Sequence, residues 1–244
     1  MNYSFSMHNQ TLLQFIKSHP IGASLTRDES EPYAFLKLVA KEYKAHSIVS
    51  RQGEVDTRIF IVQSGWACLQ RGLQNGDRQI IDTPLRGDII GVRAVDGPSI
   101  ATLSAISDLS LFEIPRRALA RATLLHRPLG NMLTRAIARQ NSILTEHLMN
   151  TGRRNAMSRT AHFLLELEER LSAYGLASGG RYECPLTQQE LADTLGLTPV
   201  HVNRTLGELR KSEMVSFKAG SVEVLSRKKL VALAGFDKEY LRLM

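Results

Sequence analysis

The sequence is poor in cysteine and has no long apolar run. Only two cysteines, Cys68 and Cys184, occur among 244 residues, which excludes a disulfide framework and the four thiolates of an iron–sulfur cluster. No stretch approaches the ~18 consecutive apolar residues of a membrane span. The segment Met1–Gln10 lacks the basic and then apolar order of a signal peptide. We therefore expect a cytoplasmic chain with no membrane partner.

Catalytic and metal-binding motifs are also missing. The sequence has no nucleophile elbow, no phosphate-binding glycine loop, no pair of carboxylates with a histidine and no metal-ligand spacing. We therefore expect no enzyme activity, no bound metal and no identifiable cofactor. The net charge of +7 and the pI near 9.6 agree with an acidic partner such as nucleic acid.

The segment Leu186–Leu209 has the pattern of a helix-turn-helix. Thr187 and Glu190 have the spacing of a capping box at the start of a first helix. Gly196 stands where a left-handed residue ends that helix. Thr198 can then cap a second helix. Two capped helices joined by a short glycine turn are typical of a DNA-binding motif rather than of an ordinary helical hairpin.

The second helix of this motif carries the side chains that read bases. Pro199 occupies its first position, where a missing N–H costs nothing. Three apolar residues are spaced to bury one face: Val202, Leu206 and Leu209. The outward face is left with Val200, His201, Asn203 and Arg204. Arginine can bind guanine, asparagine can bind adenine and valine can pack on a thymine methyl group.

The middle of the chain is rich in short strands. Glycines recur at Gly53, Gly65, Gly76 and Gly87, and Asn75-Gly76 is a strong hairpin signal. The spacing predicts an all-β barrel, roll or sandwich. Its strands are expected at Ile59–Gln63, Trp66–Leu73, Gln79–Thr83, Ile89–Val92, Ala101–Ala105 and Leu109–Ile114. Helices are expected before it, the second from about Glu31 to Glu42.

Helical spacing returns after Pro115. A short helix is predicted at Arg116–Leu125, and Leu129–Met149 can form one long helix. Its apolar spacing is close to a coiled-coil seam, which predicts pairing with a second chain, a buried helix in a monomer being the alternative. The expected dimer contacts are Leu133, Ile137, Gln140, Leu144 and His147 or Leu148.

Two further features complete the C-terminal region. The segment Asn150–Asn155 breaks the helical pattern, and we place a hinge there. A helix follows from Ala156 to Tyr174. After the helix-turn-helix, Met214–Phe217 and Val222–Leu225 flank a turn and predict a short hairpin, the wing of a winged helix. Lys218 at its tip can contact phosphate.

This order of elements resembles the Crp/Fnr family of bacterial transcription regulators over nearly the whole chain. Gly53-Glu54 with Ile59–Val62 resembles the first strands of the family's sensor, and Gly87-Asp88-Ile89-Ile90-Gly91 resembles the motif at its pocket. The resemblance implies an α+β fold with a cyclic-nucleotide-binding-like β-roll at 1–115. A short helix and a long dimerisation helix are implied at 116–152, and a winged helix-turn-helix at 153–244.

The resemblance also implies a function. We expect a homodimeric transcriptional regulator that binds a palindromic operator in double-stranded DNA and contacts RNA polymerase. Arg204 matches the arginine that the family uses on guanine, and Asn203 matches a base-selecting position of the Fnr branch. Pro199 and Val200 depart from the family's charged residues, which puts the usual half-site in doubt. The candidate DNA contacts are Thr187, Gln188, Thr198, Pro199, Val200, His201, Asn203, Arg204 and Lys218.

The sensor departs further from the family. Cyclic-AMP binders follow the glycine motif with a glutamate where this chain has Val92, and they hold the cyclic phosphate with an Arg-Ser pair. Here Ser99 has no arginine beside it, and Arg93 is the one nearby candidate. We therefore do not expect cyclic AMP to bind. The candidate effector pocket comprises Gly91, Val92, Arg93, Ser99, Ile100, Gln140, Leu144 and Thr145.

Several inputs stay open from the sequence. Haem needs only one or two axial ligands, and His126 and His147 lie near the end of the sensor. Cys184 precedes the helix-turn-helix, where an oxidised thiol would repel DNA phosphate. The alternatives to an effector-free regulator are a cyclic-nucleotide-responsive regulator or interaction module, a haem or thiol sensor, and an enzyme with a DNA-targeting domain.

Overall fold

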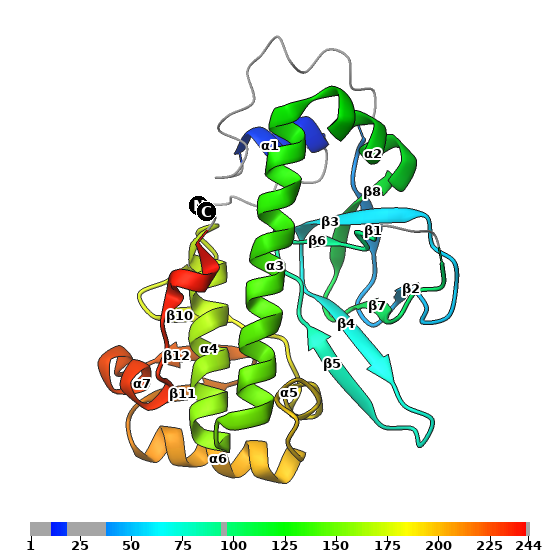
Figure 1. The fold of residues 1–244 in the computed structure, drawn as a ribbon. Helices are drawn as coiled ribbons and strands as arrows, with labels where there is room; N and C mark the ends of the chain where they lie inside the picture. The colour runs from blue at the N-terminus through cyan, green and yellow to red at the C-terminus, as the bar shows by residue number, and fades with distance from the viewer. Residues whose placement is uncertain (1–10, 19–37, 94–96, 243–244) are drawn as a thin grey trace. The chain divides into compact units, whose positions relative to one another are not determined.

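A computed structural model describes residues 11–18, 38–93 and 97–242, and Figure 1 shows their arrangement into helices and strands. The chain divides into two units. Unit 1 comprises residues 1–67, 84–140 and 243–244, and unit 2 comprises residues 68–83 and 141–242. The division falls within strand β4 (Ala67–Gly72) and within helix α3 (Arg127–Arg153). Each unit is described by itself below.

Unit 1 is built on antiparallel strands. One sheet has the order β1-β8-β3-β6, and β2 pairs with β7 beside it. Their bounds are β1 Lys41–Tyr43, β2 Ile48–Ser50, β3 Arg58–Ser64, β6 Ile89–Ile90, β7 Thr102–Ala105 and β8 Leu109–Pro115. The predicted strands over β3, β6, β7 and β8 are confirmed, whereas β1 and β2 were not predicted.

The predicted helix from Glu31 to Glu42 is wrong at its end. Residues 31–37 lie outside the described residues, but Lys41 and Glu42 belong to β1, where they pair with Leu111 and Ser110 of β8. Backbone pairing with a distant strand has overridden the helical spacing, as tertiary context commonly does.

Three helical segments pack against the sheet of unit 1. They are α1 (Leu12–Ser18), α2 (Arg116–Leu125) and the first half of α3. Phe15 of α1 meets Phe112 of β8 with ring centroids 5.3 Å apart. The core they share comprises Leu12, Phe15, Ile16, Ile59, Ile61, Phe112, Ile114, Leu119, Ala122 and Leu129.

Two glycines of unit 1 are required by close backbone approach. Gly65 has φ +87°, and a Cβ there would lie 2.2 Å from the carbonyl oxygen of Asp108. Gly91 has φ +84°, and a Cβ would lie 3.1 Å from the carbonyl oxygen of Arg58. A side chain at either position would therefore meet backbone strain, together with a steric clash at Gly65 and a tight contact at Gly91.

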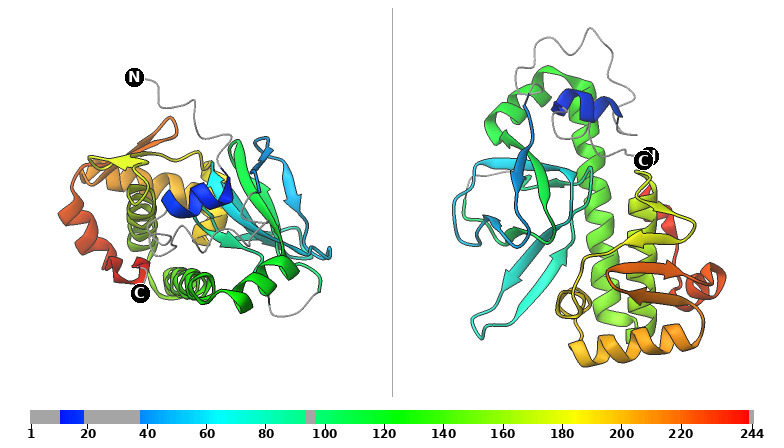
Figure 2. Two further views of the ribbon diagram at one scale, coloured as in Figure 1. Left: turned by 90° about the horizontal axis from the view of Figure 1, so that it is seen from above. Right: turned by 180° about the vertical axis from the view of Figure 1, so that it is seen from behind.

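Unit 2 combines a hairpin, two long helices and the winged helix-turn-helix. The hairpin pairs β4 with β5 (Arg78–Asp82) around the predicted Asn75-Gly76 turn. The second half of α3 lies alongside α4 (Ala156–Ser172) in Figures 1 and 2. The remaining helices are α5 (Gln188–Leu195), α6 (Pro199–Lys211), α7 (Arg227–Ala234) and a 3-10 turn η4 (Lys238–Leu241).

A four-stranded sheet with the order β11-β12-β10-β9 packs against α4. Its strands are β9 Ala177–Ser178, β10 Arg181–Glu183, β11 Val215–Lys218 and β12 Ser221–Val224. The right-hand view of Figure 2 shows this sheet facing the viewer. The predicted wing is confirmed as the β11–β12 hairpin.

The two units differ from the predicted domains. The prediction placed the β4–β5 hairpin in the sensor and gave the long helix a segment of its own. In the structure the hairpin groups with the helix-turn-helix, and α3 is divided between the units. Two ion pairs lie between the hairpin and the helices of unit 2: Arg78 of the hairpin binds Asp193 of α5, and Asp82 binds Arg170 of α4. Hydrophobic periodicity does not reveal such contacts.

Candidate nucleic-acid interface

Helix α5 begins and ends as its sequence predicts. The hydroxyl of Thr187 accepts from the Glu190 amide at 3.2 Å, and the Glu190 carboxylate accepts from the Thr187 amide at 2.7 Å. The helix ends at Gly196, whose φ of 61° is left-handed. Both ends of α5 are therefore capped by residues of the motif itself. The buried face comprises Leu191, Ala192, Thr194 and Leu195.

Helix α6 follows after a three-residue turn. The hydroxyl of Thr198 accepts from the amide of His201 at 3.2 Å, and Pro199 is the first helical residue. The face of α6 that packs inward buries Val202, Thr205 and Leu209. Leu206, which was expected to be buried, is half-buried, whereas its neighbour Thr205 is buried.

The outward face of α6 is exposed and holds the predicted base-reading side chains. Val200 is 78% exposed although it is apolar. The side chain of Arg204 is 71% exposed, and its contact with Glu208 is 3.8 Å long. His201 and Asn203 are exposed too. Because Val200, Asn203 and Arg204 stand three and four residues apart, they share one face of the helix. This face can present an arginine fork, an amide and a methyl group together.

The wing presents its predicted basic residue. Lys218 is exposed at the end of β11, next to a turn in which Ala219 and Gly220 have φ of 50° and 75°. Two left-handed residues in succession make the type I′ turn that suits a tight hairpin. Lys218 can therefore reach a phosphate without hindrance from its own hairpin.

The α3–α4 corner is tied to the helix-turn-helix by one arginine. The guanidinium of Arg159 on α4 donates to the carbonyls of Thr151 and Arg154 at 3.0 Å each, and to that of Leu195 at the end of α5. The predicted break at Asn150–Asn155 is narrower than expected, because α3 continues to Arg153 and Asn155 already caps α4. Arg159 thus links the α3–α4 corner to the C-terminal end of α5 through hydrogen bonds to both.

In unit 1 the motif Gly87–Gly91 is held by Asp88. The side chain of Asp88 is 2% exposed and binds Arg139 of α3 at 2.8 Å. It also accepts from the amide of Leu85 at 2.7 Å. A buried carboxylate with both a cation and an amide donor is well compensated. Asp88 therefore fixes the turn and joins it to the first half of α3.

The structure brings two of the candidate pocket residues together. Nη2 of Arg93 lies 3.4 Å from the hydroxyl of Ser99. The same guanidinium, however, donates to the carbonyls of Gly97, Pro98 and Asp56 at 3.1, 2.6 and 3.2 Å. Ile100 beside them is 68% exposed. Both terminal nitrogens of Arg93 are thus engaged within unit 1 rather than held open for an anion, whereas its buried Nε has no hydrogen-bond partner among the described residues.

The other candidate pocket residues are not gathered into one site within either unit. Gly91 and Val92 lie at the end of β6, and Val92 packs against the core of unit 1. Gln140 is half-buried on α3. Leu144 and Thr145 belong to unit 2, where the hydroxyl of Thr145 donates to the carbonyl of Asn141 in its own helix at 2.9 Å.

Two regions of the chain match known protein families. Residues 40–124 match the cyclic nucleotide-binding domain, and residues 158–233 match the Crp-like helix-turn-helix domain. The structure of FixK2 from Bradyrhizobium japonicum superposes with a TM-score of 0.73 at 28% identity, over 82% of this chain and all of that one. The chain belongs to the Crp/Fnr family of transcriptional regulators.

The curated relatives of this Crp/Fnr protein are regulators by name. The fumarate and nitrate reduction regulatory protein of Vibrio cholerae is 29% identical over 192 residues, 78% of this chain and 76% of the relative. The nitrogen fixation regulation protein FixK of Rhizobium meliloti is 28% identical over 204 residues, 83% of this chain and 90% of the relative. The predicted family, fold class and function as a DNA-binding regulator are therefore confirmed.

The predicted dimer contacts of the Crp/Fnr protein divide into two groups. Ile137 and Leu148 on α3 are 42% and 71% exposed, and Leu133, Gln140 and Leu144 are half-buried. His147 instead turns into its own chain, with Nδ1 3.1 Å from the carbonyl of Ile81 and Nε2 3.0 Å from Glu166. Of the alternatives His147 and Leu148, only Leu148 is presented on the outside of α3.

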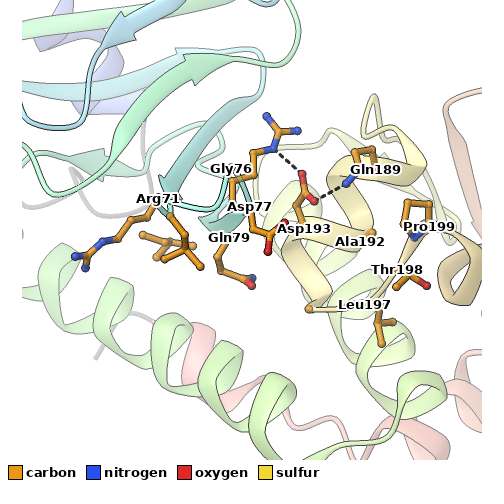
Figure 3. A pocket seen from close by; sticks show the side chains of 14 residues that line it. Arg71, Gly76, Asp77, Gln79, Gln189, Ala192, Asp193, Leu197, Thr198 and Pro199 are labelled. Atoms are coloured by element: carbon orange, nitrogen blue, oxygen red, sulfur yellow. Dashed lines mark hydrogen bonds and ion pairs between the residues drawn. The ribbon is translucent and has the colours of Figure 1, made fainter.

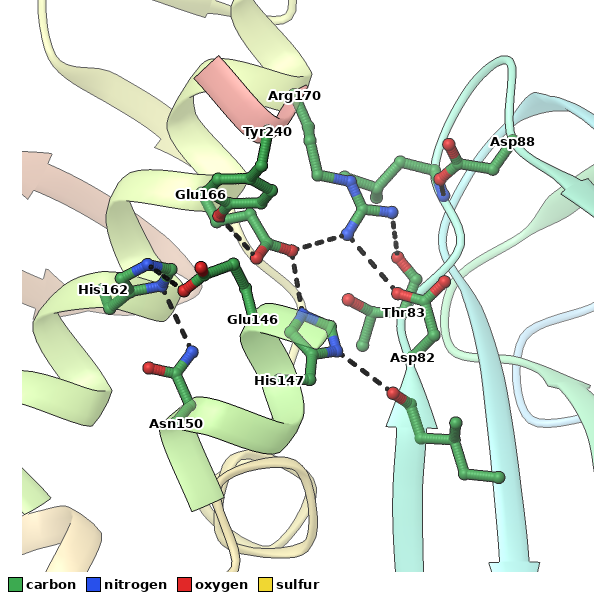
Figure 4. Close-up of polar contacts among 12 residues, drawn as sticks. Asp82, Thr83, Asp88, Glu146, His147, Asn150, His162, Glu166, Arg170 and Tyr240 are labelled. Atoms are coloured by element: carbon green, nitrogen blue, oxygen red, sulfur yellow. Dashed lines mark hydrogen bonds and ion pairs between the residues drawn. The ribbon is translucent and has the colours of Figure 1, made fainter. Parts of the chain in front are cut away.

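A buried polar network, shown in Figure 4, was not predicted from the sequence. Arg170 of α4 is 1% exposed and binds Glu166 at 3.0 Å and Asp82 of the hairpin at 3.4 Å. It also donates to the carbonyl of Thr83, and the hydroxyl of Tyr240 donates to Glu166 at 2.9 Å. In the sequence, only the i, i+4 spacing of Glu166 and Arg170 indicated a part of this network. It reads equally well as a solvated pair.

The network holds charge inside unit 2. Burial alone would lower the pKa of His147, but the carboxylate of Glu166 outweighs burial and raises it to about 9. Burial would raise the pKa of Glu166, but His147 and Arg170 lower it to about 2. Both ring nitrogens of His147 therefore act as donors. As an axial haem ligand it would first have to break these bonds.

A groove of about 690 Å³ lies between the β4–β5 hairpin and the helix-turn-helix. Figure 3 shows Asp77 and Gln79 on one side and Asp193, Leu197 and Thr198 on the other. Arg78 binds Asp193 at 2.6 Å, and Gln79 donates to the carbonyl of Thr194 at 3.2 Å. The hairpin is therefore docked beside the N-terminus of α6, and Thr198 and Pro199 line both this groove and the predicted interface.

Cys184 lacks the properties of a redox sensor. Its side chain is fully buried, and burial raises the pKa of its thiol to about 12. Reactive cysteines are accessible and have a lowered pKa, since the thiolate is the reacting form. The structure thus argues against the oxidation role proposed for Cys184 and favours packing. Among the described residues, no helix is long and apolar enough to cross a membrane.

Proposed function

We propose that the protein acts as a homodimer that places two copies of α6 in successive major grooves of a palindromic operator. The supporting observation is the outward face of α6, where Val200, Asn203 and Arg204 are exposed. The opposite face is buried by Val202, Thr205 and Leu209. An apolar valine left 78% exposed among polar groups is explained by packing against thymine methyl groups.

Each exposed residue has a role that follows from its chemistry. Arg204 donates its fork to guanine, and Asn203 binds the edge of adenine. Pro199 has no donor, so it contributes shape only. Phosphate contacts, which set the position on DNA without reading sequence, come from Thr187, Gln188, Thr198, His201 and Lys218.

DNA-affinity selection with the purified full-length chain tests this proposal. At ~150 mM salt non-specific phosphate binding is weak, so enriched sequences report specific contacts. We expect a palindrome whose half-sites are centred about one helical turn, ~34 Å, apart. Enrichment of no palindromic sequence would overturn the proposed function.

The dimer is proposed to form along α3. Ile137, Leu144 and Leu148 follow a spacing of seven and four residues on one side of the helix, as in a coiled-coil seam. We expect Ile137→Glu to give monomers with much weaker operator binding, since it buries a charge in the seam. Sedimentation measures the mass. Arg135→Glu is the control, because Arg135 is exposed on the side of α3 away from the seam. An Ile137→Glu protein that stays dimeric rejects the seam.

The sensor input is proposed to be something other than a cyclic nucleotide, or to be absent. The supporting geometry is that of Arg93, whose guanidinium is occupied by three backbone carbonyls. A specific ligand at one hundred times its Kd would stabilise the fold by about 2.7 kcal/mol. We expect millimolar cyclic AMP to leave the unfolding midpoint and operator affinity unchanged. A rise of several degrees would contradict this proposal.

RNA polymerase is proposed as the second partner, because the family resemblance implies it. Gel-shift analysis with operator DNA, this protein and bacterial RNA polymerase would show a slower ternary complex on a promoter that carries the operator. Independent binding of the two proteins, without any mutual increase in affinity, would reject this partner. In vitro transcription from the same promoter then distinguishes activation from repression.

A further inference from the structure

We propose that Gln188 on α5 is a positioning residue for base recognition, because its amide orients the amide of Asn203 on α6. The inference rests on the proposed base contact of Asn203. The observation that carries it is a side-chain contact between the two helices: Nδ2 of Asn203 donates to Oε1 of Gln188 at 3.4 Å. Both side chains are exposed on the outer surface of the helix-turn-helix.

The position of Gln188 is defined by the capping of α5. It is the first residue of the helix, and Thr187 before it is bonded to Glu190 through both backbone and side chain. Asn203 stands on the exposed face of α6, one turn after Pro199. The packing of α5 on α6 therefore places one fixed amide beside another.

The contact removes an ambiguity in how Asn203 meets a base. An asparagine amide reads adenine by donating from Nδ2 to N7 and accepting from N6 at Oδ1. A free amide can turn over and present these groups in the reverse order. With one N–H of Nδ2 directed at Gln188, the second N–H and Oδ1 point outward in a fixed order. One hydrogen bond thus sets the donor–acceptor pattern without occupying the groups that read the base.

The direction of the hydrogen bond, from Asn203 to Gln188, also suits the DNA backbone. Because Oε1 of Gln188 accepts from Asn203, its Nε2 keeps two donors, and among the described residues Nε2 has no partner. A phosphate needs donors, so this orientation lets Gln188 bind phosphate and Asn203 at once. The reverse orientation would direct Oε1 at a phosphate and repel it. Gln188 therefore links a contact that positions the protein to one that specifies sequence.

The neighbouring amide provides a matched control. Gln189 is also exposed on the first turn of α5, but its Nε2 donates to Asp193 at 2.7 Å, within the same helix. It has no contact with Asn203 and is not among the proposed DNA contacts. We expect Gln189→Ala to leave base preference and operator affinity unchanged.

The test measures base preference in the full-length protein with the operator obtained by selection. Binding is measured to this operator and to versions changed at each base pair, for wild type, Gln188→Ala, Asn203→Ala and the double variant. Asn203→Ala identifies the base pair that Asn203 reads. We expect Gln188→Ala to reduce the preference at that same pair by about 3- to 10-fold, the range of one hydrogen bond. In the double variant the preference should equal that of Asn203→Ala alone.

Gln188→Glu separates positioning from phosphate binding. The carboxylate keeps an acceptor for Asn203, so base preference should be retained. The added negative charge near phosphate should lower affinity for all sequences, most strongly at low salt. Because Gln188 is exposed, circular dichroism and the urea midpoint should match wild type for each variant.

Three results would overturn the inference. Gln188→Ala could weaken binding equally on every sequence, which would make Gln188 a phosphate contact alone. Asn203→Ala could leave base preference intact, so that no base contact exists for Gln188 to position. The effects of the two single variants on preference could also simply multiply, without coupling. Failure of the proposed function itself differs from all three, because wild type would then enrich no palindrome at all.

Discussion

The candidate pocket of unit 1 and the outward face of α6 in unit 2 both contain an arginine, but the two arginines are used in opposite ways. Arg93 donates to three backbone carbonyls and approaches Ser99. Arg204 is 71% exposed and has one long contact with Glu208. The guanidinium of Arg93 is bound to the fold, whereas that of Arg204 is accessible on the surface.

This difference concerns what each guanidinium can still bind. A cation that already has its hydrogen bonds gains little from a new anion, because binding would exchange one set of bonds for another. An exposed cation held on a rigid helix meets phosphate or guanine without such an exchange. The arginine on α6 is therefore available to an anionic or guanine partner, whereas the arginine nearest the candidate pocket is engaged by backbone carbonyls.

The largest expected effect on stability concerns a third arginine, Arg170, which lies neither near the candidate pocket nor on the outward face of α6. Arg170→Ala should destabilise unit 2 by about 3–5 kcal/mol, because it removes the buried cation that the carboxylates of Glu166 and Asp82 share. Urea unfolding of the full chain measures the loss. Arg210→Ala, at an exposed site on α6, should change the free energy of unfolding by less than about 0.5 kcal/mol. Equal midpoints for both variants would show that the network contributes nothing.

Alkaline pH should weaken the same network. The pKa of His147 is about 9 in the folded protein against 6.5 for the free side chain. The stabilisation from its charge is therefore complete below pH 6.5 and is lost as the pH rises through about 9, by at most about 1.4 kcal/mol per pH unit. Urea unfolding at pH 6.5, 8 and 9.5 measures it. His147→Gln should abolish this loss; an identical pH profile in that variant would assign it to another group.

Arg204→Ala should affect DNA binding rather than stability. Operator binding should weaken by about 1–3 kcal/mol, with relaxed preference at one base pair in each half-site. The free energy of unfolding should stay within about 0.5 kcal/mol of wild type, because Arg204 is exposed. Titration of a set of operator variants measures both quantities. A uniform loss on every sequence would mean that Arg204 contacts phosphate only.

The smallest effect is expected for the arginine of unit 1. Arg93→Ala should lower the free energy of unfolding by about 0.5–1.5 kcal/mol, since it removes hydrogen bonds to backbone carbonyls. Operator affinity of the folded protein should not change. If Arg93→Ala abolished regulation in vitro while leaving stability intact, Arg93 would serve a ligand. The claim that its guanidinium serves only the fold would then be wrong.

Local signals predicted the helix-turn-helix well. Thr187, Glu190 and Thr198 form the caps that their spacing indicates, and Gly196 adopts the left-handed conformation. These features depend on residues at most four apart, so the sequence contains all the information they need. The same holds for the wing turn and for the hairpin at Asn75-Gly76.

Pairings between residues far apart in the sequence could not be predicted from local signals. Lys41 and Glu42 form a strand because β8, about seventy residues later, offers its edge. His147 fits a seam by periodicity but turns into its own chain, because Glu166 and Ile81 provide partners there. In both cases the deciding partner is far away in the sequence, and periodicity along one helix or strand carries no information about it.

The sequence alone is enough for the resemblance to the Crp/Fnr family, which its motifs carry. The order of elements and the outward side chains on α6 follow from capping, turn chemistry and apolar spacing over short distances. Only the folded chain shows that Arg78 of the β4–β5 hairpin contacts Asp193 of α5, that Arg93 is occupied and that Gln188 faces Asn203. Each of these is a polar contact between distant segments, and hydrogen-bond geometry exists only once the backbone has brought the two groups together.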